Sequence, residues 1–329
     1  MEKKRDNTLD VMKVMCALFV VIGHVVSVYT PFSYVKMPVN GVLMWVWKLI
    51  YSFHMPTFVA ISGALFFSLK KRGKYNNKSQ FVFNKVHRLL CPYFFLAFLM
   101  VIPIMHYIGD FVSYETILNN YIFAENPRHL WYLYMLFFVF VISNAFYDVI
   151  QKRPIMAMFC LFVLFNLGAF FPLKFQLYNI FKYIFYFYLG GVLYENRNIL
   201  NIKINLLIQV TILFFIFILL FFLHEKTKMM NSQTGSMLLA LSGMILLFYC
   251  SKIISKYQIP FFYRLSKNSY GIYLFHPMLN YLIFYYWGGI LFSNPYIACV
   301  IVSIVITVIS VFLTEFFRKC RLGFIIGER

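Results

Sequence analysis

Histidine side chains can exchange a proton at neutral pH, and four of the seven histidines stand out in or beside strongly apolar segments. They are His24, His54, His129 and His276. Imidazole has an unperturbed pKa near 6.5, so it suits general acid–base catalysis and nucleophilic group transfer. One such histidine is more often structural than catalytic. Four of them in a chain with only 12% charged residues favour a functional cluster.

The first apolar segment adds two ionisable residues, Asp10 and Lys13, to His24. Eleven helical steps of about 100° separate Lys13 from His24, which is about 20° beyond three full turns, so both lie on one face about 16 Å apart along the axis. Asp10 precedes Lys13 by three residues and can pair with it. Because an ionisable side chain within a membrane span costs about 2.5–3.5 kcal/mol, this stripe is a functional candidate. Under the alternative interpretation, Asp10 and Lys13 anchor the helix at the interface and His24 is a core residue.

No metal site is predicted. The four histidines share no i,i+3 or i,i+4 spacing, and no carboxylate accompanies them at depth. The cysteines contain no C-x-x-C pair and suggest neither a zinc site nor a disulfide framework. They are Cys16, Cys91, Cys160, Cys250, Cys299 and Cys320.

Weaker signals come from small and basic residues. Ser62 begins a small-residue patch, Ser62-Gly63-Ala64, that a neighbouring helix or a slender ligand could approach closely. Arg88 precedes Pro92 by four residues at an expected helix entrance, where it could anchor the helix or hold a phosphate. Pro277 follows His276 directly and should kink its helix.

The elements that position these residues are membrane helices. At 62% hydrophobic residues and a mean hydropathy of +0.74, the chain is unlike a soluble enzyme, a nucleic-acid binder or a secreted disulfide scaffold. We predict an all-α polytopic membrane protein, one integral-membrane domain over 1–329, with about ten transmembrane helices. The apolar runs are Leu9–Tyr29, Leu43–Leu69, Pro92–Tyr107, Leu130–Ile150, Ile155–Phe171, Phe175–Tyr194, Leu206–Leu223, Ser236–Ile254, Tyr270–Leu291 and Pro295–Phe317.

The positive charges predict the orientation. Of the 30 Lys and Arg residues, 22 fall in the termini and alternate loops on one side, 5 on the other side and 3 within spans. Cationic loops stay in the cytoplasm, so both termini should be cytoplasmic and the protein should reside in the cytoplasmic membrane. The net charge of +19 is then mainly a topology signal, and we expect no nucleic-acid partner.

In these residues the chain resembles the integral-membrane acyltransferase-3 family over nearly its whole length. The resemblance rests on Arg5-x4-Asp10-x2-Lys13-x10-His24, His54-Met-Pro56, Ser62-Gly63, Arg88-Leu-x2-Pro92, His129-Leu-Trp131 and Ser269-Tyr270-Gly271-Ile-Tyr273-Leu-Phe-His276. Family members often have Arg where this chain has Lys13, and some carry a fused C-terminal extracytoplasmic domain. Since this sequence stops at Arg329, transfer is expected within the membrane part or through a separate protein.

The resemblance implies an O-acyltransferase that moves an acyl group, commonly acetyl, from acyl-CoA to a carbohydrate or cell-envelope glycan. His24 would be the general base or the acyl carrier, with Asp10 and Lys13 beside it. The substrate-binding candidates are His54, Ser62, Arg128, His129, Trp131, Tyr273 and His276. The candidates for holding the donor phosphates are Arg88, Lys70, Lys71 and Arg72. We expect His54 or His276 to stabilise the oxyanion or to orient His24.

Two other functions fit the same pattern. A transporter or flippase for an amphipathic or lipid-linked solute could use the polar stripe as a path, although we find no paired halves with matching broken helices. A catalytically silent sensor or assembly subunit is the third option. The identity of the acceptor, the acyl chain length and the oligomeric state stay open, with a homodimer as one option.

Overall fold

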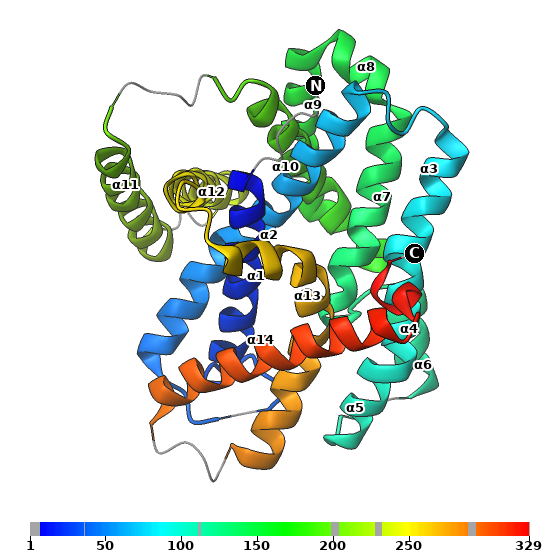
Figure 1. Cartoon of the computed structure of the whole chain (residues 1–329), viewed down its shortest axis with the longest axis vertical. Coiled ribbons are helices and arrows are strands. Elements are labelled where there is room, and N and C mark those ends of the chain that lie inside the picture. Colours follow the sequence, from blue (N-terminus) through cyan, green and yellow to red (C-terminus); the bar gives the residue numbers. More distant parts are fainter. Residues whose placement is uncertain are drawn as a thin grey trace. The chain divides into compact units, whose positions relative to one another are not determined.

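The computed structural model describes residues 7–35, 37–110, 113–198, 204–227, 232–288 and 294–328. Within these ranges there is no strand, which confirms the all-α class. The helices, labelled in Figure 1 where there is room, are α1 (Asn7–Ser27), α2 (Gly41–Lys71), α3 (Lys78–Lys85), α4 (Cys91–Leu96), α5 (Ile102–Tyr107), α6 (Tyr114–Ile117), α7 (Trp131–Ala145), α8 (Tyr147–Lys152), α9 (Pro154–Leu167), α10 (Leu177–Glu195), α11 (Leu206–Lys226), α12 (Gln233–Ser255), α13 (Pro260–Trp287) and α14 (Pro295–Lys319).

Six helical segments in the described part of the chain are long and apolar enough to cross a membrane. They are α1, α2, the continuous run Lys78–Tyr107, α11, α12 and α14. The chain is therefore a multi-pass membrane protein. Ten crossings and cytoplasmic termini stay predictions. The segment Pro154–Phe170, formed by α9 and the turn after it, is also an apolar helix but is shorter than these six.

Two helices begin ten or more residues before their predicted starts. The third run begins at Lys78 rather than Pro92, because Asn77 caps it by accepting a hydrogen bond from the Gln80 backbone N–H at 3.0 Å. Helix α13 begins at Pro260, ten residues before the predicted start at Tyr270, since proline suits the first helical position. Its predicted end at Leu291 lies outside the described residues.

The run Lys78–Tyr107 contains two wide turns, η1 (Val86–Leu90) and η2 (Ala97–Val101), and each ends two positions before a proline. Because Pro92 and Pro103 have no backbone N–H, the helix cannot continue its regular hydrogen bonding there. The N–H of Cys91 instead reaches back five residues to the Val86 carbonyl. The chain thus crosses both prolines as one helix and places Arg88 on a π-helical turn.

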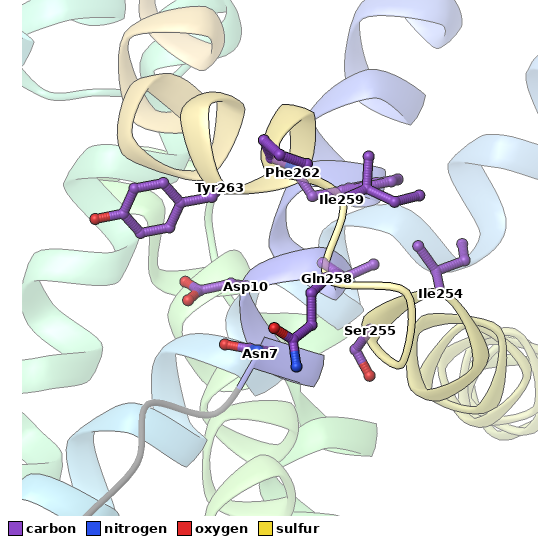
Figure 2. Close-up of a pocket in the computed structure, with 10 residues that line it drawn as sticks. Asn7, Asp10, Ile254, Ser255, Gln258, Ile259, Phe262 and Tyr263 are labelled. Atoms are coloured by element: carbon purple, nitrogen blue, oxygen red, sulfur yellow. The ribbon is translucent and has the colours of Figure 1, made fainter.

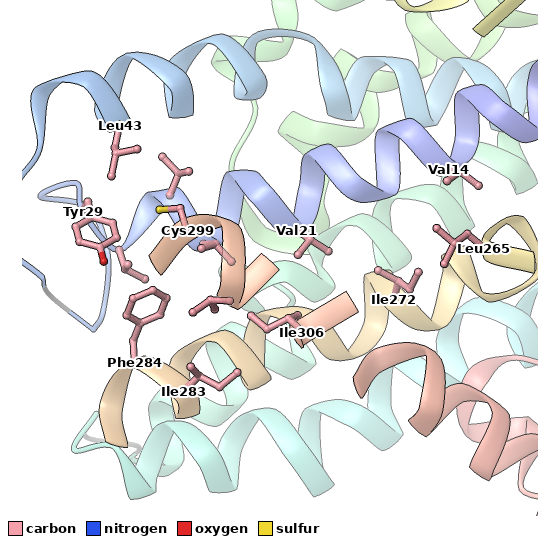
Figure 3. Close-up of a cluster of buried hydrophobic side chains, with 14 residues drawn as sticks. Val14, Val21, Tyr29, Leu43, Leu265, Ile272, Ile283, Phe284, Cys299 and Ile306 are labelled. Carbon is pink, nitrogen blue, oxygen red and sulfur yellow. The ribbon is translucent and has the colours of Figure 1, made fainter. Parts of the chain in front are cut away.

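The chain divides into two compact units. The first comprises Met1–Phe58 and Ile202–Phe316. In it, α12 and α13 pack along α1, and α11 packs against α12 (Figure 1). Apolar side chains from α1, α2, α13 and α14 form a core, shown in Figure 3. Its labelled members are Val14, Val21, Tyr29, Leu43, Leu265, Ile272, Ile283, Phe284, Cys299 and Ile306.

The second unit comprises Val59–Asn201 and Phe317–Arg329. Here α10 packs against α7 and α9. The C-terminal half of α2 also approaches α10 closely, because a Cβ on Gly63 would collide with the Phe187 carbonyl and one on Gly190 with the Ala60 carbonyl. The prediction of a small-residue patch for close approach is therefore confirmed, and its partner is a helix.

Candidate active site

Three of the four predicted histidines come together in the first unit. The rings of His24 on α1 and His276 on α13 meet edge to face with centroids 4.9 Å apart. The Tyr51 ring of α2 lies 6.0 Å from His24 and 4.8 Å from His54. His54 and His276 are buried, and His24 is half-buried. Three helices thus supply one imidazole cluster.

Hydrogen bonds define the tautomer of two of these rings. His54 Nδ1 lies 2.7 Å from the Ile50 carbonyl oxygen, and His276 Nδ1 lies 2.8 Å from the Ile272 carbonyl oxygen. Because a carbonyl oxygen only accepts, each Nδ1 must carry the hydrogen. In the neutral rings the lone pair is therefore on Nε2, which can accept but not donate.

The helix backbone around His24 is held by groups that the sequence did not single out. Asn280 Nδ2 on α13 donates to the His24 carbonyl at 2.9 Å, and the Ser27 hydroxyl donates to the same oxygen at 2.7 Å. Asn280 lies four residues after His276, so both face α1 from one side of α13. That i,i+4 spacing is the signal that could have revealed Asn280.

At the other end of α1, Asp10 lines a pocket of about 300 Å³ (Figure 2). The carboxylate accepts a hydrogen bond from the Ser266 hydroxyl at 2.8 Å. Asn7, Gln258 and Tyr263 also line this pocket, and none of them was predicted. Helix α1 is continuous between the pocket and His24.

Lys13 and His24 therefore keep the predicted separation of about 16 Å along α1. Tyr273 joins the histidine cluster, with its ring centroid 6.1 Å from that of His276. Arg5, which begins the first-helix pattern, lies outside the described residues.

The second unit holds three of the predicted substrate-binding candidates, Arg128, His129 and Trp131. Arg128 adopts a positive φ of 56° and forms an ion pair with Asp110. Burial raises the pKa of Asp110 above its ordinary value. His129 is buried, and the half-buried Trp131 ring lies 5.2 Å from that of Tyr183. The site thus offers a partly accessible aromatic face beside a paired arginine.

Ser62 also belongs to this unit, and its hydroxyl lies 3.4 Å from the Tyr132 hydroxyl. Lys182, for which the sequence offered no role, donates to the Tyr178 hydroxyl at 3.3 Å. Ser62 directly precedes Gly63, at the point where α2 approaches α10. Lys182 and Tyr178 lie on α10 itself.

The predicted phosphate-binding cations lie in the second unit as well. Lys70 donates to the Tyr75 carbonyl at 2.7 Å, and Lys71 lies 3.6 Å from Glu195. Arg72 donates to the Ser68 hydroxyl at 3.3 Å, and Arg88 is exposed on its π-helical turn. Three of these basic residues therefore lie at the end of α2, and the fourth lies on the π-helical turn that follows α3.

Comparison with known proteins identifies the chain at the family level. A model described as an acyltransferase domain, that of the acyltransferase-3 family, matches residues 6–315. No curated protein and no solved structure matches the chain.

Proposed function

The chain belongs to the acyltransferase-3 family of membrane acyltransferases, and we propose that it transfers an acyl group, most simply acetyl, from acyl-CoA to a hydroxyl group of a cell-envelope carbohydrate. The observation that carries this proposal is the imidazole cluster on a membrane helix whose other end opens at a pocket. A group that enters at Asp10 has to travel about 21 Å along α1 to reach His24, and about 16 Å of this path lies between Lys13 and His24. An extended pantetheine arm has the same order of length.

His24 is the general base in this proposal. It removes the proton from the acceptor hydroxyl, and the oxygen attacks the thioester carbonyl. The tetrahedral intermediate then expels the CoA thiolate, which takes the proton back from the imidazolium. One ester bond forms, one thioester bond breaks, and His24 returns to its starting state.

His276 and His54 act on His24 rather than on the oxyanion. An oxyanion needs a hydrogen-bond donor, and the neutral Nε2 of either ring is an acceptor. With Nδ1 held by a backbone carbonyl, His276 presents a fixed edge to His24. This supports an orienting role, one of the two that the sequence left open.

The donor and acceptor are assigned by chemistry. The cations Arg88, Lys70, Lys71 and Arg72 suit the CoA phosphates, because phosphate recognition needs positive charge and N–H donors. The Trp131 face suits a sugar ring, with Arg128, His129 and Ser62 as hydrogen-bonding groups around the acceptor. In the first unit, Tyr273 is the substrate-binding candidate whose ring lies beside that of His276.

The proposal is tested by incubating membranes that contain the protein with labelled acetyl-CoA and following the label into envelope glycans. His24→Ala should lower transfer by at least about 10²-fold, because general base catalysis contributes that much. His106→Ala is the matched control, since His106 is exposed and in the other unit, and it should leave transfer unchanged. Undiminished transfer in His24→Ala would remove His24 from the mechanism.

The acceptor is best identified by mass spectrometry of surface glycans from cells with and without the gene. A mass shift of one acyl unit would identify both the transferred group and its recipient. Movement of a solute without any turnover of acyl-CoA would favour the transporter instead.

A further inference from the structure

Asn280 connects two of the three helices in the histidine cluster. It is completely buried on α13, and its Nδ2 donates to the His24 carbonyl at 2.9 Å. Four residues earlier, His276 places its ring against the His24 ring. One face of α13 therefore holds both the backbone and the imidazole of His24.

The His24 carbonyl does not depend on Asn280 for a hydrogen bond. The Ser27 hydroxyl already donates to that oxygen at 2.7 Å. A fold that needed only to satisfy this carbonyl could therefore place an apolar side chain at position 280. The second donor instead restricts where the end of α1 can lie relative to α13.

The other half of the Asn280 amide is unsatisfied. Its Oδ1 is buried, and no described residue donates a hydrogen bond to it. Buried polar atoms in proteins almost always have partners, so an exception needs a reason. Because Oδ1 and Nδ2 share one carbon, this acceptor lies beside the His24 backbone.

We infer that Asn280 is a positioning residue for His24 whose Oδ1 accepts a hydrogen bond from the substrate during acyl transfer. This inference rests on the proposed function. Two groups of the reactants offer the required donor, namely an amide N–H of the pantetheine arm and a hydroxyl of the acceptor. Either one, held at Oδ1, lies within the cluster that contains the general base.

The decisive variant is Asn280→Leu, which replaces a buried amide with one unsatisfied polar atom by an apolar side chain of similar size. Such a replacement can be neutral for folding. We therefore expect an unchanged or higher melting temperature together with a fall of at least tenfold in kcat/KM. A higher KM for acetyl-CoA would identify the pantetheine amide as the donor, and a higher KM for the acceptor would identify the hydroxyl.

Asn280→Asp keeps an oxygen acceptor in the same place and should recover part of the lost kcat/KM. Asn268→Leu is the matched control, because Asn268 is buried on the same helix and donates to Glu315 at 3.2 Å. It should lower the melting temperature and leave kcat/KM unchanged. Unchanged kcat/KM in Asn280→Leu, or a parallel loss of stability and activity, would overturn the inference.

A measurement that needs no turnover separates this inference from the proposed function. Carbethoxylation of His24 by diethyl pyrocarbonate can be followed by mass spectrometry as a function of pH in the full-length protein. We expect its rate profile to differ between wild type and Asn280→Leu, and identical profiles would contradict a positioning role. If the wild-type protein transferred no acyl group, the proposed function would be wrong. The carbethoxylation profiles of wild type and Asn280→Leu would still test the role of Asn280.

Discussion

Helices α1 and α11 have the same length but opposite surroundings. Both are 21 residues long and both are apolar enough to span a membrane. In α1 the most apolar stretch is 56% buried inside the protein, whereas in α11 it is 17% buried. Yet α1 is the helix that carries Asp10, Lys13 and His24. Between these two helices, the one with ionisable residues before its last turn is therefore the more buried, although both are apolar enough to span a membrane.

The physical reason is the solvent. Lipid tails are as apolar as leucine, so an apolar side chain gains little by leaving them. A polar or ionisable group in lipid is costly and is placed in the protein interior. Helix α1, which carries more ionisable residues before its last turn than α11, is for this reason the one that packs among other helices, and its ionisable side chains can take part in chemistry there.

The largest expected effect comes from giving α11 the kind of residue that α1 carries. Phe215 lies near the middle of α11 and is 65% exposed. Phe215→Lys should cost about 2.5–3.5 kcal/mol of insertion free energy and lower the yield of folded protein. The yield can be measured by size-exclusion chromatography of a fluorescent fusion. Phe215→Leu is the control, and a normal yield of the lysine variant would show that α11 does not face lipid.

A second prediction concerns Gly23, where α1 packs closely against Tyr51 and Ile50 of α2. A Cβ on Gly23 would lie 3.0 Å from Tyr51 Cε2 and 3.2 Å from Ile50 Cγ2. Gly23→Ala should push the Tyr51 ring away from His24 and His54 and lower kcat about tenfold, since small misplacements are costly in catalysis. Gly41→Ala is the control, because a Cβ there meets nothing within 4 Å. Equal activity in the two variants would mean that the Tyr51 position is unimportant.

The features that could be predicted from sequence depend on the helical period of the side chains or on the free-energy cost of placing a polar group in lipid. The single-face stripe of α1 follows from helical geometry, and the small-residue patch at Gly63 follows from the need for close approach. The gathering of His24, His54 and His276 was expected because ionisable groups avoid lipid. None of these predictions required knowledge of which helices are neighbours.

The features that were missed depend on neighbours. Tyr51 and Asn280 are ordinary residues in apolar helices until α2 and α13 are placed beside α1. The pocket residues Gln258 and Tyr263 come from the turn before α13 and its first helical turn, which the sequence assigned to a loop. The early start of α13 was missed because its first ten residues are too polar for a hydropathy signal.

The smallest effect is expected for a substitution at Lys13 that tests whether only the positive charge of this side chain matters. Lys13→Arg keeps the charge and adds a planar group with several donors. If Lys13 acts as a point charge near the donor path, kcat/KM should stay within about threefold of wild type, a change worth less than about 1 kcal/mol of transition-state stabilisation. Lys13→Met, of similar length without charge, should lose substantially more. Complete loss of transfer in Lys13→Arg would contradict a point-charge role, because only the shape and hydration of the cation differ between the two residues.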